Sequence, residues 1–532
     1  MKLNDQGLKN KGEWEKAGFT LPKFDRAAMI AATEKAPGWV HFGAGNIFRA
    51  FPAALQQRLL EGGLEKTGII VAEGYDGEII DKAYTPYDCL SLLVTLKADG
   101  NIEKTVIASV AKALRLDMAP DMLYLKRVFT SPSLRMVSFT ITEKGYSLVD
   151  RDGKTDPGVA KDFAAGPEKA ESYMGRVAAL CYGRYKAGSL PFAMVSMDNC
   201  SHNGDKLFAA VDAFAQAWVK GGLADRGFLD YVRNPKRVSF PWSMIDKITP
   251  RPDDSVRASL NKAGFSDTEG TVTAKSTYVA PFVNAEETQY LVIEDLFPAG
   301  RPALEKTGVL FTDRATVDQV EKMKVCTCLN PLHTALAVFG CLLGFTKICD
   351  EMQDEDLVKL VRVIGYTEGL PVVVNPGIIS PQEFIDTVVN VRFPNPFMPD
   401  TPQRIACDCS QKIPIRFGET IKAYAAKKSA ANLTFIPLVL AAWLRYLLGV
   451  DDEGRTFSVS PDPLYESLAR KLTGIQLGGP VPEGALHPIL SDQTLFASDL
   501  YAVGLGDKVE AYFKELIAGP GAVRRTLRKT LG

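Results

Sequence analysis

This chain has few histidines, few cysteines and almost no net charge. It has 4 histidines and 9 scattered cysteines among 532 residues, and its formal net charge at pH 7 is −1. A chain this close to neutral offers no basic field, which excludes nucleic acid or an anionic membrane as the main partner. Scattered cysteines favour a reducing, cytoplasmic setting in which most thiols are free.

Long uninterrupted apolar segments are also missing. The N-terminal stretch MKLNDQGLKNKGEWEK has no apolar core of a signal peptide. The most apolar stretch, residues 433–450, is interrupted by Pro437 and Arg445. It is short for a bilayer span, so we expect a buried helix there.

Two kinds of pattern divide the chain. β-favouring runs are predicted at 39–42, 68–76, 103–110, 134–142 and 190–198, with helical patterns at 118–129 and 168–187. Beyond about residue 290, strand signals nearly vanish and helices are predicted at 314–349, 354–365, 433–449, 461–473 and 507–518. Strands alternating with helices are typical of a doubly wound parallel sheet. We therefore predict an α/β Rossmann-like domain with an N-terminal arm over 1–295, and a mainly α-helical substrate domain over 296–532.

The stretch HFGAGNIFRAF, residues 41–51, follows the first predicted strand and opens a helix. Gly43 suits a tight turn, and Gly45 would let the backbone approach a pyrophosphate at the helix N-terminus. The third glycine of the dinucleotide motif is replaced, so an ordinary strand–turn–helix is the alternative. The residues predicted to bind the cofactor here are Gly43, Gly45, Asn46, Ile47, Phe48 and Arg49.

The second predicted strand ends in VAEGYD, which places Glu73 and Asp76 just beyond it. An acid there can accept hydrogen bonds from the adenosine ribose, which favours NAD and repels the extra phosphate of NADP. The predicted cofactor is therefore NAD, with NADP as the alternative. The competing interpretation is that both residues are surface loop acids.

A zinc site is the most obvious explanation for Cys326, Cys328 and His333, and the residue spacing disfavours it. Residues two apart on a helix point to different faces, and no C-x₂-C pair exists to complete the site. The second pair, Cys407 and Cys409, has the same spacing. We predict buried cysteines and no metal.

The remaining polar residues of this apolar run are Lys324, Asn330 and His333. A buried lysine loses its proton readily and can act as a general base, while an amide can donate to a carbonyl oxygen. The alternative from residue types alone is a satisfied polar core. Among the other histidines, His41 on the first strand is interpreted as a satisfied core residue, and His202 lies in a loop after a strand.

Taken in order, the motifs resemble the polyol-specific long-chain dehydrogenase/reductase family over nearly the whole chain. That family includes mannitol 2-dehydrogenase and the fructuronate and tagaturonate reductases. The segments that carry the resemblance are HFGAGNIFRAF (41–51), TITEKGY (140–146), SMDNCSHNG (196–204), SFPWSMIDKITP (239–250), EKMKVCTCLNPLHTAL (321–336) and RIACDCSQKIP (404–414).

The resemblance implies metal-independent hydride transfer between NAD(P) and a secondary alcohol of an open-chain sugar derivative. It assigns Lys324 as general acid/base, Asn199 and Asn330 as donors to the reacting oxygen, and His333 as an orienting group. It also implies that Asp246, Arg404 and Lys412 bind substrate and that Glu143 lies near a proton path.

One departure from the family concerns the spacing between Lys324 and Asn330, which has one residue more than usual. On a regular helix, one residue would rotate the lysine by about 100°. A one-residue π-bulge would absorb it, and such bulges are frequent at functional sites. Lys322 is the alternative base.

Candidate cations for a substrate carboxylate are Arg404, Lys412, Arg416 and Lys247. They favour a sugar acid, D-fructuronate/D-mannonate, over fructose/mannitol. Mannitol 2-dehydrogenase and tagaturonate reductase activities are the alternatives, and an inactive NAD-binding sensor or scaffold is the alternative of another class. The expected partners are a small sugar acid or polyol, with the protein a monomer or small homo-oligomer.

Overall fold

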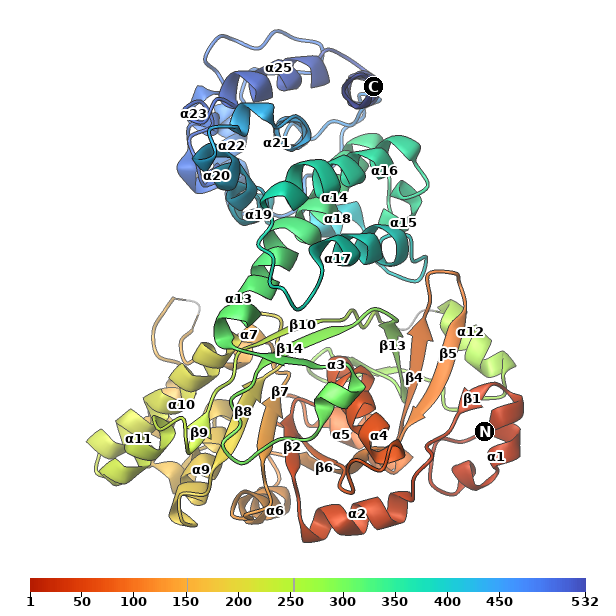
Figure 1. Ribbon diagram of the computed structural model, residues 1–532, viewed down its shortest axis with the longest axis vertical. Helices are drawn as coiled ribbons and strands as arrows, with labels where there is room; N and C mark the ends of the chain where they lie inside the picture. Colours follow the sequence, from red (N-terminus) through yellow and green to blue (C-terminus); the bar gives the residue numbers. More distant parts are fainter. Residues whose placement is uncertain (151, 252–253) are drawn as a thin grey trace. The chain divides into compact units, whose positions relative to one another are not determined.

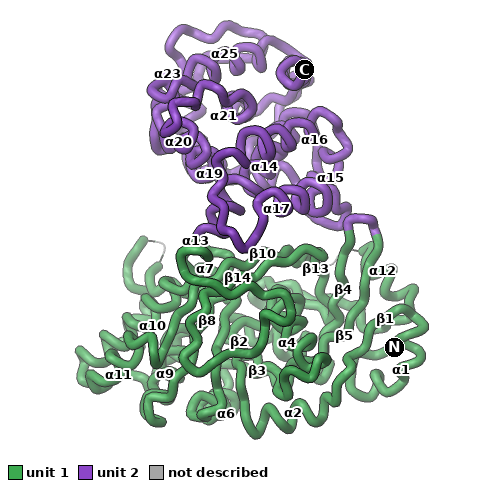
Figure 2. Tube along the Cα trace, in the orientation of Figure 1, with its two compact units in different colours: residues 1–97, 101–318 green, residues 98–100, 319–532 purple. Residues whose placement is uncertain are grey.

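The computed structural model describes residues 1–150, 152–251 and 254–532. It divides into two compact units, coloured separately in Figure 2. Unit 1 contains Met1–Lys97 and Asn101–Asp318, and unit 2 contains Ala98–Gly100 and Gln319–Gly532. The domain boundary expected after residue 295 stays a prediction.

A six-stranded parallel sheet forms the centre of unit 1. Its strand order is β6-β3-β2-β7-β8-β9. Numbered by their order along the chain within this sheet, the strands follow the order 3-2-1-4-5-6 of the dinucleotide-binding fold. The predicted doubly wound α/β class is therefore confirmed. The strands are β2 (Trp39–Phe42), β3 (Ile69–Glu73), β6 (Val110–Arg115), β7 (Met136–Phe139), β8 (Phe192–Ser196) and β9 (Val238–Ser239).

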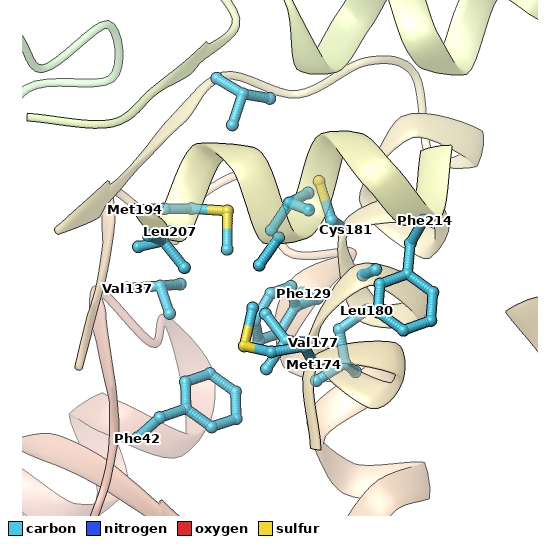
Figure 3. Close-up of a cluster of buried hydrophobic side chains, with 14 of the residues drawn as sticks. Phe42, Phe129, Val137, Met174, Val177, Leu180, Cys181, Met194, Leu207 and Phe214 are labelled. Carbon is cyan, nitrogen blue, oxygen red and sulfur yellow. The ribbon is translucent and has the colours of Figure 1, made fainter. Parts of the chain in front are cut away.

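Both faces of this sheet are covered, because successive strand residues point to opposite faces and both sets are apolar. On β2, Val40 and Phe42 belong to one buried cluster and Trp39 to the other. Figure 3 shows Phe42, Val137 and Met194 from the first cluster, together with residues of the helices that cover it. Those helices include α6 (Ala119–Phe129), α8 (Pro157–Ala165), α9 (Tyr173–Lys186), α10 (Asn203–Lys220) and α11 (Arg226–Val232).

Helix α10 illustrates why these elements form. Leu207, Val211, Phe214 and Trp218 recur at a spacing of three or four residues and are buried. This spacing gives one apolar stripe on the helix. In Figure 1, α9, α10 and α11 lie beside β8 and β9. The opposite face is covered by α3 (Asn46–Ala50), α4 (Pro52–Glu61) and α5 (Glu78–Ala83).

Unit 1 also has strands that local pattern did not separate. A four-stranded sheet has the order β1-β5-β4-β13, a three-stranded sheet has β10-β14-β15, and β11 pairs with β12. The strand predicted at 103–110 was wrong as a single element, because β5 pairs back on β4 while β6 joins β3 in the central sheet. The strands are β1 (Phe19–Thr20), β4 (Ser91–Leu96), β5 (Ile102–Ile107), β10 (Ser243–Asp246), β11 (Thr271–Val272), β12 (Tyr278–Val279), β13 (Phe282–Glu286), β14 (Tyr290–Glu294) and β15 (Leu310–Thr312).

The N-terminal arm of unit 1 contains two α-helices. They are α1 (Lys11–Lys16) and α2 (Arg26–Lys35). Trp14 on α1 is fully buried and packs against the rings of Phe19 and Phe265. The arm is therefore anchored by aromatic packing. Unit 1 also contains the short helices α7 (Thr142–Gly145) and α12 (Asp254–Lys262).

Unit 2 is mainly helical, as predicted. Helix α13 (Arg314–Met323) begins in unit 1 and continues into unit 2, where a π turn, η5 (Lys324–Cys328), leads into α14 (Asn330–Leu343). By length and apolar composition Arg314–Leu343 could cross a membrane, but 78% of its most apolar window is buried, as in a core helix.

The later elements of unit 2 are α15 (Ile348–Glu351), α16 (Glu355–Arg362), the π turns η6 (Val363–Gly369) and η8 (Val388–Arg392), α17 (Pro381–Thr387), α18 (Pro402–Ile405), α19 (Cys409–Arg416), α20 (Gly418–Ala426), α21 (Phe435–Tyr446), α22 (Tyr465–Lys471), α23 (His487–Leu490), α24 (Gln493–Phe496), α25 (Gly506–Leu516) and α26 (Ala522–Leu531). The apolar stretch at 433–450 forms α21, whose residues Ile436 to Tyr446 are buried. That expectation is confirmed.

Candidate active site

The glycine turn lies at the carboxyl end of β2. Gly43 has φ +102°, and a Cβ there would lie 2.2 Å from the carbonyl oxygen of Thr140, so only glycine fits. Gly45 precedes α3, and a Cβ built on it would meet nothing within 4 Å. The backbone therefore faces open space where the strand order places a dinucleotide. These residues fit NAD.

The side chains that follow the turn point mostly into the protein. Phe48 is fully buried and stacks on His41, with 4.3 Å between ring centroids. Arg49 is buried and donates to the carbonyl oxygen of Ala280 and to Asn46 Oδ1, both at 2.7 Å. A contact from Phe48 or Arg49 to the cofactor would therefore come from the backbone.

His41 supports this turn from the strand below it. Its Nδ1 lies 2.6 Å from Ser138 Oγ and its Nε2 lies 2.9 Å from Thr140 Oγ1. Burial lowers the pKa of His41 to about 3, against a smaller opposing effect of the Gly43 backbone. The interpretation of His41 as a satisfied core histidine is confirmed.

Glu73 and Asp76 lie at the end of β3 and are both nearly inaccessible, at 5% and 2% exposure. Glu73 Oε2 accepts from the N–H of Ala44 at 2.8 Å, and Oε1 accepts from the N–H groups of Tyr75 and Asp76 at 2.7 and 3.1 Å. Glu73 thus ties the glycine turn to the loop after β3. Its Oε2 keeps a lone pair that could accept a ribose hydroxyl.

The loop after β8 is organised by a carboxylate that sequence reasoning missed. Asp198 accepts from the N–H groups of Ile141 and Thr142 at 2.9 and 2.8 Å and from the Tyr146 hydroxyl at 2.5 Å. Burial raises the pKa of Asp198, while the Tyr146 hydrogen bond lowers it. Asp198 and Tyr146 stand inside the quoted motifs SMDNCSHNG and TITEKGY, which was the available signal.

Three predicted site residues of unit 1 lie at the carboxyl ends of these strands or nearby. Asn199 is the exposed residue after Asp198, and Asp246 is the last residue of β10, 7% exposed and paired in register with Tyr290. Glu143 lies on α7, which follows β7, and accepts from Lys206 Nζ at 2.5 Å. Glu143, Tyr146 and Lys206 line a cavity of about 480 Å³, which suits a group near a proton path.

A cluster of rings and charges joins the Asn199 loop to the start of α13. His202, with φ +51°, stacks on Trp242 with ring centroids 4.1 Å apart, and its Nε2 lies 3.3 Å from Asp318. The Arg314 guanidinium lies 4.9 Å from the Trp242 ring centroid and 3.0 Å from Glu294. We call His202, Trp242, Arg314 and Asp318 the ring–charge cluster. All of it lies within unit 1.

In unit 2, the π turn absorbs the extra residue of this chain. The N–H of Leu329 donates to the carbonyl oxygen of Lys324 at 3.0 Å, a bond that spans five residues. A π hydrogen bond has this span. The expected π-bulge is therefore confirmed. Lys324 is 3% exposed whereas Lys322 is exposed, which supports Lys324 as the base.

His333 lies on the first turns of α14, close to Asp400. Its Nε2 is 3.6 Å from Asp400 Oδ2, too far for a hydrogen bond, and has no hydrogen-bond partner among the described residues. Burial lowers the pKa of His333 to about 4, opposed by Asp400 and reinforced by Arg416, Arg392 and Arg404. At neutral pH this is an uncharged imidazole among guanidinium groups.

The cations of unit 2 are held by specific partners. Arg404 forms an ion pair with Asp400, and Arg416 donates to Thr334 Oγ1 at 2.6 Å. Lys412 donates to the carbonyl oxygen of Cys407 at 2.5 Å, and burial lowers its pKa, with Arg416 adding to the effect.

Lys247, the fourth candidate cation, lies in unit 1. Its amine donates to the carbonyl oxygen of Glu286 at 2.8 Å and to Gln289 Oε1 at 3.0 Å. Both of these partners belong to unit 1.

Cysteine contributes no metal centre among the residues that the structure describes, where no three His, Cys, Asp or Glu side chains group to hold a metal ion. Cys326 and Cys328 are buried, as predicted, and burial raises the pKa of Cys326 to about 11. Both are protonated thiols at neutral pH. The expected independence from metal stays a prediction.

Comparison with protein families gives two adjoining matches. Residues 37–306 match the model of the mannitol dehydrogenase Rossmann domain, and residues 316–509 match that of the mannitol dehydrogenase C-terminal domain. A protein of Thermotoga maritima named D-mannonate oxidoreductase is 54% identical over 538 residues, which cover 100% of this chain and 99% of that protein.

Two solved structures resemble the whole chain. A D-sorbitol dehydrogenase in substrate-free form aligns with a TM-score of 0.80 at 25% identity, covering 98% of this chain and 99% of that one. The Pseudomonas fluorescens mannitol 2-dehydrogenase in ternary complex with NAD and D-mannitol aligns with a TM-score of 0.68 at 28% identity, covering 100% and 99%.

Proposed function

This chain belongs to the mannitol dehydrogenase family, and we propose that it is an NAD-dependent oxidoreductase that interconverts D-mannonate and the corresponding keto-sugar acid, D-fructuronate. The 54% identity to a D-mannonate oxidoreductase over the whole chain supports the substrate. The glycine turn supports binding of NAD, because the space beside the Gly45 backbone is open and could hold the pyrophosphate.

The environment of His333 gives the main structural support for a sugar-acid substrate. The buried Nε2 of His333 has no hydrogen-bond partner among the described residues. Burying such a group costs free energy unless a bound ligand forms the missing hydrogen bond. Arg392, Arg404 and Arg416 act electrostatically on this imidazole, and Asp400 is the acid that opposes them. An excess of positive charge suits a substrate carboxylate, which D-mannonate has and D-mannitol lacks.

In the proposed mechanism, NAD supplies the hydride acceptor for the substrate's secondary alcohol. Lys324 accepts the hydroxyl proton in oxidation and returns it in reduction. The amides of Asn199 and Asn330 donate to the reacting oxygen and stabilise its developing negative charge. His333, neutral at pH 7, orients a substrate hydroxyl, and Glu143 passes the proton toward solvent.

The remaining roles concern the rest of the substrate. Arg404 and Lys412 bind the carboxylate end, and Asp246 accepts from substrate hydroxyls. A cytoplasmic location and a monomer or small homo-oligomer complete the proposal.

Substrate preference tests this function directly. The purified protein is assayed with NADH and D-fructuronate, D-tagaturonate or D-fructose, and kcat/KM is compared. D-fructuronate is expected to be the best substrate, while faster turnover of D-fructose than of both uronates would contradict the sugar-acid proposal. NADH binding without turnover of any of them would favour the inactive sensor.

A charge substitution sharpens this test. Arg404→Gln is expected to raise KM for D-fructuronate about tenfold or more, because one charge-assisted contact is lost, and to leave KM for NADH unchanged. Arg470→Gln, on an exposed face of α22, serves as the matched control.

A further inference from the structure

A small hairpin packs against the loop that follows β3. It consists of β11 and β12, joined by the turn from Thr273 to Thr277. The contacts with the loop come from three consecutive residues of this turn. The Thr273 hydroxyl donates to Asp76 Oδ2 at 2.6 Å, the Ala274 N–H donates to Glu78 Oε1 at 3.1 Å, and the Lys275 amine donates to the carbonyl oxygen of Tyr75.

This position is the adenosine end of the fold. In a sheet with this strand order, the residues after the strand next to the glycine turn flank the adenosine ribose. Tyr75 lies in that loop with 66% of its surface exposed, and the Lys275 amine lies 4.5 Å from its ring centroid. An exposed aromatic face and an ammonium group are thus presented together beside the cofactor position.

The acids of the loop carry less unbalanced charge than their sequence suggests. Three backbone N–H groups donate to Glu73, and Thr273 donates to Asp76, which is 2% exposed. Hydrogen bonds to a carboxylate stabilise and partly neutralise its charge. Repulsion of an additional phosphate is therefore weaker than two bare carboxylates would produce.

The other charged groups around the loop are paired. Glu78 forms an ion pair with Lys82 at 2.6 Å, and Arg115 forms ion pairs with Asp81 and Asp117. Lys275 differs, since its amine contacts the carbonyl oxygen and the ring of Tyr75. Neither partner carries a formal negative charge.

We propose that Lys275 determines cofactor selectivity by offering its ammonium group to the 2′-phosphate of NADP, so that the enzyme accepts NADP as well as NAD. The hairpin holds the lysine in place through Thr273 and Ala274. The proposal rests on the proposed function only for its activity measurement, because cofactor binding is measured without a sugar.

The test compares Lys275→Glu and Lys275→Met with the wild type. Dissociation constants for NADPH and NADH are measured by nucleotide fluorescence without substrate, followed by kcat/KM with D-fructuronate. Lys275→Glu is expected to weaken NADPH binding about tenfold or more and to change NADH binding less than twofold, with Lys275→Met between wild type and Lys275→Glu. Lys262→Glu, on exposed α12, is the matched control and should leave the ratio unchanged.

Two outcomes would overturn the proposal: a wild type that does not bind NADPH, or an unchanged NADPH to NADH ratio in Lys275→Glu. Failure of the proposed function gives a different result, namely selective cofactor binding without turnover of any sugar acid. Because Lys275 is exposed, neither substitution should prevent folding.

Discussion

The candidate site residues of the two units are held by different means. In unit 1, Asp198 and Glu73 each accept hydrogen bonds from several backbone N–H groups at strand ends, so the main chain fixes them. In unit 2, Lys324 lies on a π turn and His333 lies among guanidinium groups. The position of a side chain held by backbone N–H groups depends on an intact sheet. The position of a side chain on a π turn depends on the spacing of a few residues in the helix. Substitutions in the two units should therefore fail differently.

Removing the lysine of the π turn should have the largest effect. Lys324→Ala is expected to lower kcat about 100-fold or more, because the general acid/base is lost, while the dissociation constant of NADH is unchanged. Both quantities are measured with D-fructuronate and NADH at pH 7.

Lys322→Ala is the matched control for this experiment, since Lys322 is exposed and lies two residues earlier in the same helix. It should leave kcat within about twofold of the wild type. If Lys322→Ala is the damaging change and Lys324→Ala is mild, the π turn does not set the catalytic register.

Removing the main-chain anchor of unit 1 should instead reduce stability. Asp198→Ala leaves the N–H groups of Ile141 and Thr142 and the Tyr146 hydroxyl without their acceptor, so the free energy of unfolding should fall by about 3 kcal/mol. Tyr146→Phe removes one of these three bonds and should cost about 1 kcal/mol. Urea unfolding measures both, and equal effects would show that the backbone bonds contribute little.

The loss of stability in acid should involve both units. Burial lowers the pKa of His41 to about 3 and of His333 to about 4, from 6.5 in the unfolded chain. As the pH falls below 6.5, these two histidines therefore become protonated in the unfolded state while they stay neutral in the native state. Between pH 6.5 and its folded pKa, each histidine should lower the free energy of unfolding by about 1.4 kcal/mol per pH unit. Above pH 6.5 the histidine is neutral in both states and this cost is absent.

Calorimetry between pH 7.5 and 5 resolves these contributions. His41→Gln and His333→Gln should each reduce the dependence of the melting temperature on pH, in unit 1 and unit 2 respectively. His487→Gln, at an exposed position, should keep the wild-type dependence. An unchanged slope in His333→Gln would show that its imidazole is protonated in the folded protein.

Local pattern predicted four strands of the central sheet, β2, β3, β7 and β8, but did not separate β6 and missed β9. The glycine turn and the alternation of strands with helices predicted the Rossmann fold, because that order is typical of a doubly wound parallel sheet. The sheet of β4 and β5 escaped prediction because its outer strands are distant in sequence: Phe19–Thr20 pairs with β5, and Phe282–Glu286 pairs with β4. No local signal records such pairing.

The candidate site shows the same limit at the level of single residues. Spacing relative to the family predicted the π turn, because an inserted residue has few ways to fit a helix. The backbone donors that hold Glu73 and Asp198 could not be predicted. The sequence shows the same acidic residue whether its carboxylate accepts from the main chain, a ribose hydroxyl or water. The ring–charge cluster was missed because its members are far apart in the sequence.

The ring–charge cluster gives the smallest expected effect, since its contacts are between side chains of unit 1. Trp242→Phe keeps a ring for His202 and Arg314 but loses the hydrogen bond from Nε1 to Asp205 at 2.8 Å, so unfolding should become easier by less than about 1 kcal/mol. Trp242→Ala also loses the stacking and the cation–π contact, and should cost about 1 kcal/mol more. Chemical unfolding compares the two variants, and kcat for each reports whether the Asn199 loop depends on the ring. If Trp242→Ala is as stable as Trp242→Phe, the rings do not hold the start of α13, and the Arg314 ion pair with Glu294 is its main anchor.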